Sequence, residues 1–218
     1  MNFEEIEFAV NPEQRCACVL LLDTSGSMGG APITALNEGL QLFQSDIRND
    51  PLASQRIEVA IVTFGNGGVQ TAQDFVTVDK FEAPRLTAGG VTPMGEAINH
   101  GLDMLRTRKK AYQDNGIPYY RPWTFLITDG APSDSWETAA QRIRSEENAK
   151  ALAFFAVGVG EEAELDTLAK IAVRKPMKLQ GLKFNELFLW LSRSQKRVSA
   201  SKIGEPTSLP GNEDWAVV

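Results

Sequence analysis

Four stretches of the chain are mostly apolar and are followed by polar or small residues. They are residues 16–22, 57–64, 123–128 and 151–159. A strand that is buried on both faces, as in a parallel sheet, has this kind of continuous apolar run. Two shorter apolar runs, 75–78 and 177–179, predict further strands, and we expect the first of these to be antiparallel and at a sheet edge.

Between the predicted strands, apolar residues recur at every third or fourth position. The clearest series is Ile33, Leu36, Leu40, Phe43 and Ile47. This series indicates one face of an amphipathic helix. The pattern predicts further helices at 93–108, 135–150, 162–173 and around 184–191. The segment 109–122 is polar and is interrupted by an Asn-Gly pair and two prolines, which favours a loop.

Alternating strands and helices predict a single α/β domain. We expect a doubly wound, mostly parallel sheet with helices on both faces and one short antiparallel edge strand. The pattern divides the chain into a lead-in at 1–13, the domain at 14–193 and a C-terminal tail at 194–218. The tail is rich in Ser, Pro, Gly and charge, so we expect it to be flexible. The alternative interpretation is that the apolar end of this tail, residues 215–218, is a short docking segment.

Composition and charge narrow the function classes. The chain has 218 residues, of which 43% are hydrophobic, and its formal net charge is −6. An acidic surface repels phosphate backbones, which disfavours nucleic-acid binding. No apolar run approaches the roughly 20 residues of a membrane span. Residues 1–5 lack the basic start of a signal peptide, so we expect a cytoplasmic protein in which Cys16 and Cys18 are buried thiols.

Doubly wound folds bind ligands at the carboxyl ends of their strands, where the strand order reverses. Polar side chains cluster in the sequence at such ends, and all of them offer oxygen: Asp23, Ser25, Ser27, Thr92 and Asp129. Mg²⁺ and Mn²⁺ prefer carboxylate, hydroxyl and water oxygens. The sequence therefore predicts a site for Mg²⁺ or Mn²⁺ with a position open to an outside carboxylate. Ordinary Asx and Ser/Thr turns are the alternative interpretation.

Three segments resemble the three parts of the metal-ion-dependent adhesion site of von Willebrand factor A domains. They are residues 21–28 (LLDTSGSM), 89–95 (GGVTPMG) and 126–130 (LITDG). The likeness extends over about residues 14–192. Within that family, the chain is most similar to the compact bacterial TerY/YegL type, which is associated with tellurite resistance. The segments that carry this finer likeness are 45–51, 121–123 and 128–134.

The resemblance implies roles for the candidate residues. Ser25, Ser27 and Thr92 would coordinate the ion directly, and Asp23 and Asp129 would act directly or through water. A protein partner would supply a Glu or Asp as the last ligand. The resemblance further implies an adaptor in a bacterial stress-response, tellurite-resistance or defence system, beside kinase- or phosphatase-like proteins.

A metal-dependent phosphohydrolase with Asp23 as nucleophile is the alternative function. That chemistry needs a second acid two residues later, where Ser25 stands. No histidine or cysteine lies near the motifs to act as a base, so we expect no enzymatic activity. His100 has no partner ligands in the sequence and is expected to be a packed or surface side chain. The aromatic residues Tyr119, Tyr120, Trp123 and Trp136 are candidates for loop packing or for a recognition rim.

Overall fold

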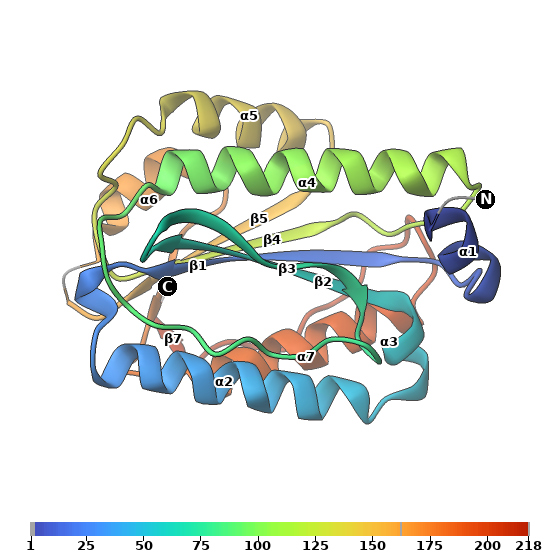
Figure 1. Ribbon diagram of the computed structural model, residues 1–218, viewed down its shortest axis with the longest axis horizontal. Coiled ribbons are helices and arrows are strands. Elements are labelled where there is room, and N and C mark those ends of the chain that lie inside the picture. The colour runs from blue at the N-terminus through green and yellow to red at the C-terminus, as the bar shows by residue number, and fades with distance from the viewer. Residues whose placement is uncertain (1–2, 162, 218) are drawn as a thin grey trace.

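A computed structural model describes residues 3–161 and 163–217 of the chain. The strands are β1 (Cys16–Thr24), β2 (Ile57–Gly65), β3 (Gly68–Thr77), β4 (Trp123–Thr128), β5 (Ala153–Val159), β6 (Met177–Leu179) and β7 (Ala216–Val217). The helices are α1 (Phe3–Val10), α2 (Ala31–Arg48), α3 (Pro51–Arg56), α4 (Met94–Asp114), α5 (Glu137–Asn148), α6 (Leu165–Ile171) and α7 (Phe184–Ala200), with a 3-10 turn η1 (Gly26–Met28). Figure 1 shows one sheet between two helical layers, which confirms the predicted fold class.

The sheet order is β3-β2-β1-β4-β5-β6-β7. The five central strands, β2, β1, β4, β5 and β6, are parallel to one another. Strands β3 and β7 pair antiparallel at the two edges of the sheet. The sequence predicted only one such edge strand. From β1 the chain builds outward first to β2 and later, on the other side, to β4. The order therefore reverses between β1 and β4, and their carboxyl ends flank the crevice in which such folds bind ligands.

Strand β1 shows why its sequence is apolar throughout. Cys18, Leu20 and Leu22 point into one core, and Val19 and Leu21 point into the other. Side chains alternate across a strand, so a strand covered by helices on both faces needs apolar residues at every position. Both cysteines are buried and free, as predicted.

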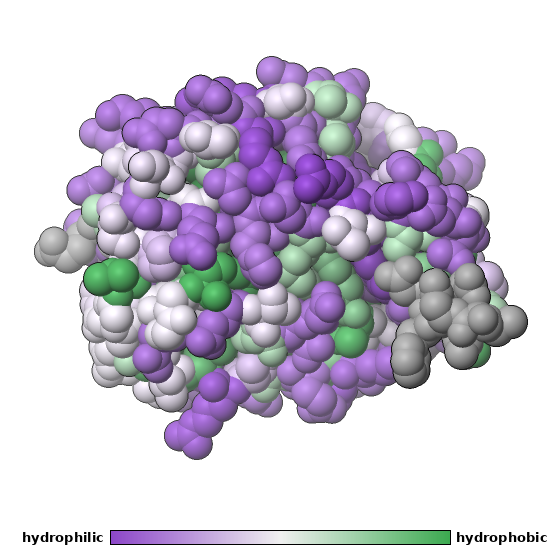
Figure 2. All heavy atoms as spheres, turned by 45° about the horizontal axis from the view of Figure 1, so that its top comes forward, coloured by the Kyte–Doolittle hydropathy of each residue, from purple (hydrophilic) through white to green (hydrophobic). Residues whose placement is uncertain are grey.

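Helices α2 and α7 cover one face of the sheet, and α4, α5 and α6 cover the other (Figure 1). The predicted apolar face of α2 is confirmed, because Leu36, Leu40, Phe43 and Ile47 are fully buried. The outer surface above α4 and α5 is mostly hydrophilic (Figure 2). Among the described residues, no helix combines the length and the apolarity that a membrane crossing requires.

Strand β3 and helix α4 are longer than the sequence predicted. Strand β3 begins at Gly68 rather than at residue 75, because it pairs with β2 along its length while most of its side chains are exposed or half-buried. Its apolar pattern is therefore weak. Helix α4 continues to Asp114, six residues into the predicted loop 109–122, because Ala111 and Tyr112 face the core. It ends at the Asn115-Gly116 pair, where Gly116 has a φ of 66°.

The domain boundary at residue 193 is wrong. Helix α7 continues to Ala200, since Gln195, Val198 and Ser199 are buried. Beyond it, the Trp190 indole donates a hydrogen bond to the Pro210 carbonyl at 2.8 Å, and Trp215 is buried against Trp190. Strand β7 then extends the sheet. The residues expected as a tail therefore pack on their own domain. Of the predicted segments, residues 1–2, 162 and 218 lie outside the described residues.

Candidate metal centre

Asp23 lies at the carboxyl end of β1, and its side chain is fully buried. One carboxylate oxygen, Oδ1, accepts a hydrogen bond from the backbone N–H of Ser25 at 2.8 Å. The other, Oδ2, accepts one from the hydroxyl of Thr128, the last residue of β4. These bonds hold the carboxylate between β1 and β4, where the strand order reverses.

Ser25, Ser27 and Asp129 form a continuous row of oxygen atoms beside Asp23. The Ser25 and Ser27 hydroxyls are 3.0 Å apart. The Ser27 hydroxyl donates a hydrogen bond to Oδ1 of Asp129 at 2.7 Å. Ser27 belongs to η1, which follows β1, whereas Asp129 directly follows β4. The fold therefore joins residues that are 102 positions apart in the sequence.

Thr92 reaches the same place from the loop that precedes α4. A Cβ placed on Gly130 would lie 3.8 Å from the Ser27 hydroxyl oxygen and 3.9 Å from that of Thr92. Both hydroxyls therefore border one small space next to Gly130. The structure thus brings together all five residues that the sequence predicted for the site.

Glycine makes the approach of the Thr92 loop feasible. Gly90 has a φ of 74°, and a Cβ there would lie 2.6 Å from the carbonyl oxygen of Gly65. Two backbone hydrogen bonds tie this loop to the end of β1: Gly26 N–H donates to the Gly90 carbonyl at 3.1 Å, and Gly89 N–H donates to the Thr24 carbonyl at 2.8 Å. A side chain at position 90 would both strain the backbone and push the loop away.

Asp134 fixes the other side of the Thr92 loop. Its carboxylate accepts hydrogen bonds from the backbone N–H groups of Gly95 at 2.9 Å and Glu96 at 2.8 Å. These groups belong to the first turn of α4, so Asp134 caps α4 and not the helix that follows it in sequence. In addition, the Ser133 N–H donates to the Thr92 carbonyl at 2.9 Å. The loop after β4 therefore positions Thr92.

Among the described residues, no Lys or Arg side chain pairs with the two carboxyl groups of the site. Asp23 and Asp129 are both buried, and within the part of the chain that the structure describes neither forms a salt bridge with Lys or Arg. Burial raises the pKa of Asp23 above its ordinary value, and the charge of Asp129 adds to this effect. The hydrogen bonds from Ser25 and Thr128 act in the opposite direction. An external cation would relieve this unfavourable burial.

The donor set fits a hard divalent cation. Among the described residues, no group of three or more His, Cys, Asp and Glu side chains is placed to hold a metal. An ion at this position would therefore need the hydroxyl oxygens as well as the two carboxylates. Mg²⁺ and Mn²⁺ accept such neutral and charged oxygen ligands together with water. Nitrogen and sulfur ligands, which zinc prefers in structural sites, are lacking around Asp23 in the described part of the chain.

The remaining residues that the sequence singled out lie elsewhere. His100 shares a hydrogen bond of 2.7 Å with the Thr71 hydroxyl on β3. Tyr119, Tyr120 and Trp123 line a cavity at the amino ends of β4 and β5. They therefore do not form a rim around Asp23. Trp136 is half-buried and packs against the core on the side of α4 and α5.

Sequence reasoning missed two residues of the site. Thr128 holds Asp23, and Asp134 holds the start of α4. The signal for Thr128 was present, because a hydroxyl directly before Asp129, at the end of a buried strand, faces the neighbouring strand end. Asp134 gave no local signal, since its hydrogen-bond partners lie 38 and 39 residues earlier.

Comparisons with known proteins place this geometry in a family. The family model of the von Willebrand factor type A domain matches residues 18–184, which include all five predicted site residues. No protein with a curated description matches the chain. Many solved structures share the fold at low sequence identity. One is the pilus adhesin SpaC of Lactobacillus rhamnosus GG in its open conformation, with a TM-score of 0.63 and 14% identity over 85% of this chain.

Two further structures are informative. Proximal thread matrix protein 1 of the mussel byssus gives a TM-score of 0.55 at 16% identity over 84% of this chain. Its structure is described as having zinc in the MIDAS motif, the metal-ion-dependent adhesion site. The SpRpn10 VWA domain gives 0.55 at 16% identity over 79% of this chain and 95% of its own. The match spans only 48% of the mussel protein and 30% of the adhesin. At such identities the likeness shows the fold alone.

Proposed function

The chain belongs to the von Willebrand factor type A domain family, and we propose that it is a protein-binding module that depends on a divalent metal ion. In this proposal the ion sits among Asp23, Ser25, Ser27, Thr92 and Asp129. An Asp or Glu of a protein partner completes its coordination. The proposal includes no catalytic step.

One observation carries the proposal. Five oxygen-bearing side chains from three separate segments converge at the crevice between β1 and β4, and the described residues provide no cation there. Turn chemistry alone explains local hydrogen bonds such as the one from Ser25 N–H to Asp23. It does not explain why Thr92 and Asp129 come to the same place from distant parts of the sequence.

The degree of exposure suggests separate roles for the residues. Asp23 and Ser25 are buried, so they would lie beneath the ion. Ser27 is exposed, which leaves the outer side of the site accessible to a partner. Two carboxylates balance the double charge of the ion, and the hydroxyls add ligands without further repulsion. A partner carboxylate would then bind as an additional oxygen ligand on the solvent side.

We propose Mg²⁺ or Mn²⁺ as the ion in the cell. The zinc described for the mussel protein supports a divalent site in a related fold, while the all-oxygen donors here favour a harder ion. A cytoplasmic adaptor of the TerY/YegL type, working beside kinase- or phosphatase-like proteins in a bacterial stress or defence system, is the finer form of the proposal. It rests on the sequence resemblance of residues 45–51, 121–123 and 128–134.

A capture experiment tests the proposal. The wild-type chain and a Thr92→Ala variant are immobilised in Mg²⁺ or in chelator, and proteins retained from a bacterial lysate are identified. We expect a partner that is retained only by the wild type in Mg²⁺. Its binding should then be lost when one of its own surface carboxylates is changed to the amide. Retention that survives both chelator and Thr92→Ala would contradict the proposal.

We propose that the chain is not an enzyme. The position two residues after Asp23, where this phosphohydrolase chemistry needs a second acid, is occupied by Ser25. The expected result is no hydrolysis of p-nitrophenyl phosphate with Mg²⁺ or Mn²⁺. Turnover that disappears in Asp23→Asn would support the phosphohydrolase alternative instead.

A further inference from the structure

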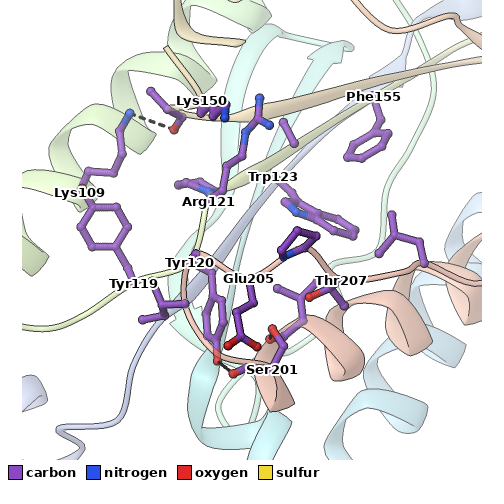
Figure 3. Close-up of a pocket in the computed structure, with 18 of the residues that line it drawn as sticks. Lys109, Tyr119, Tyr120, Arg121, Trp123, Lys150, Phe155, Ser201, Glu205 and Thr207 are labelled. Carbon is purple, nitrogen blue, oxygen red and sulfur yellow. Dashed lines mark hydrogen bonds between the residues drawn. The ribbon is translucent and has the colours of Figure 1, made fainter. Parts of the chain in front are cut away.

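A second concave site lies at the amino ends of the parallel strands, on the side of the sheet opposite to the candidate metal centre. A cavity of about 880 Å³ opens at the amino ends of β4 and β5, next to Trp123 and Ala153 (Figure 3). The metal centre lies at the carboxyl ends of the same parallel strands. The segment 201–209, which the sequence assigned to a free tail, forms one wall of the cavity. The cavity is within the usual range of about 300–1,000 Å³ for small-molecule sites.

Aromatic rings form the inner walls of the cavity. The rings of Trp123 and Phe155 lie 5.2 Å apart, and Phe155 stacks on Phe125 at 4.6 Å. The hydroxyl of Tyr120 donates to the carbonyl groups of Ser199 and Ser201, which fixes the ring against the end of α7. Figure 3 shows Tyr120, Trp123 and Phe155 around the same opening. Trp123 is 5% exposed and Phe155 is half-buried, and the Arg174 guanidinium lies over the Phe155 ring at 5.1 Å from its centroid, so part of the aromatic surface faces the cavity beside a cation.

Cations surround these rings on a protein that is acidic overall. The charged side chains that line the cavity are Lys109, Arg121, Lys150, Arg174 and Glu205. Three of the four cations already have carboxylate partners: Lys109 pairs with Glu146, and both arginines pair with Glu147. Lys150 has no ion-pair partner in the part of the chain that the structure describes, and it is exposed.

The backbone of Lys150 shows how this residue comes to the cavity. It is the only described residue other than glycine with a positive φ, at 55°. It follows the end of α5, a position at which helices commonly use glycine. Two backbone hydrogen bonds close the helix here, from Lys150 N–H to the Glu147 carbonyl at 2.9 Å and from Ala151 N–H to the Glu146 carbonyl at 2.8 Å. This helix end places Lys150 among the residues that line the cavity.

We propose that this cavity binds a small aromatic oxyanion, that is, a planar ring system that carries a carboxylate or a phosphate. The ring would contact the parts of Trp123 and Phe155 that face the cavity. The anionic group would pair with Lys150, with Arg121 and Arg174 nearby. The charge at the rim matches an anion, and the walls match a flat apolar ring. This site is separate from the proposed metal centre and does not depend on it.

Isothermal titration calorimetry with three probes of the same shape tests the proposal. The probes are 2-naphthoate, 2-naphthyl phosphate and the neutral 2-naphthamide. We expect both oxyanions to bind the full wild-type chain, with dissociation constants at least tenfold lower than that of the amide. The carboxylate and phosphate arms also distinguish which anionic group the site prefers.

Variants at Lys150 locate the binding and separate it from folding. Lys150→Gln should weaken both oxyanions about tenfold and leave the amide unchanged, and Lys150→Arg should restore most of the affinity. Lys150→Gly should weaken the oxyanions equally while the melting temperature stays the same or rises, because glycine tolerates the positive φ. Lys80→Gln, a change of an exposed lysine that does not line the cavity, is the charge-matched control and should change nothing.

The proposal is overturned if neither oxyanion binds at 1 mM, or if the amide binds as tightly as the oxyanions. It is also overturned if Lys150→Gln binds like the wild type, since the anion would then pair elsewhere. Asp23→Asn should bind the oxyanions with wild-type affinity. Loss of oxyanion binding in that variant would contradict the separation of the two sites.

Discussion

Buried carboxylates at the two ends of the sheet have opposite environments. Glu58, near the amino end of β2, is fully buried, and its oxygens accept hydrogen bonds from Arg15 at 2.7 Å and from Arg108 at 2.7 and 2.8 Å. The Tyr112 hydroxyl donates a further one. Asp23 and Asp129, at the carboxyl end, have only hydroxyl and backbone donors among the described residues.

The difference shows what each end requires. A buried carboxylate is costly unless a cation and hydrogen bonds compensate it. At the amino end the chain supplies that cation itself, so Glu58 is part of the stable framework. At the carboxyl end the described residues supply no such cation, and we propose that a metal ion from outside meets the same physical requirement. Four predictions test this contrast, beginning with the largest expected effect.

Breaking the amino-end network should cost the most. Glu58→Gln leaves Arg15 and Arg108 buried beside a neutral group, and we expect a loss of about 3–5 kcal/mol in the free energy of unfolding, measured with urea. Asp114→Asn removes an exposed salt bridge to Lys110 and serves as the control, with an expected loss below about 1 kcal/mol. Equal losses in the two variants would mean that the buried network has no special importance.

At the carboxyl end, stability should depend on the metal. With Mg²⁺ at about one hundred times its dissociation constant, we expect the wild type to gain about 2.7 kcal/mol over the protein in chelator. Asp23→Asn should lose this gain, yet in chelator its stability should stay within about 1 kcal/mol of the wild type. If Asp23→Asn in chelator lost as much stability as Glu58→Gln, the proposed difference between the two ends of the sheet would be contradicted.

The loop that carries Thr92 should be sensitive to a single methyl group. Gly90→Ala introduces a side chain at a φ of 74° and against the Gly65 carbonyl. We expect a loss of about 1–3 kcal/mol in unfolding free energy and a clear weakening of metal binding, both followed by thermal melts with and without Mn²⁺. Unchanged metal binding would show that Thr92 is not a ligand.

The two cysteines show a third response to burial, in which the group stays neutral. Burial raises the pKa of Cys16 to about 12, with a smaller contribution from Glu58, and burial also raises the pKa of Cys18. Native protein at pH 8 should therefore react with a thiol reagent only as fast as it unfolds. Because the folded thiols hold their protons more tightly than unfolded ones, stability should fall as the pH rises above about 9. Rapid labelling of native protein would contradict this.

The sequence predicted the elements whose side chains repeat regularly. The spacing of Leu36, Leu40 and Phe43 identified α2, and the apolar run from Cys16 identified β1. Strand β3 was underestimated because its exposed residues, such as Gln70 and Thr71, carry no apolar alternation. The tail was misread because the apolar residues from Trp215 onward form only a short run after a polar segment, and the partner of Trp215, Trp190, lies in α7.

The candidate site was predictable for a different reason. The carboxyl ends of parallel strands lie on the same side of a sheet, so Asp23 and Asp129 were expected on that side, and the pairing of β1 with β4 makes them neighbours. No such rule predicts which charged side chains will pair when they lie far apart in the sequence. Glu58 is the second residue of a mostly apolar strand, and its partners come from residue 15 and from α4. Only the three-dimensional structure brings these groups together.

Titration of metal-free protein with Mn²⁺, with the free ion followed by electron paramagnetic resonance, tests the central claim most directly. The account predicts one bound Mn²⁺ per wild-type chain. It predicts none in a folded double variant with Asp23→Asn and Asp129→Asn over the same concentration range. A wild type that binds no Mn²⁺ at millimolar concentration, or a double variant that binds it as tightly, would contradict the account.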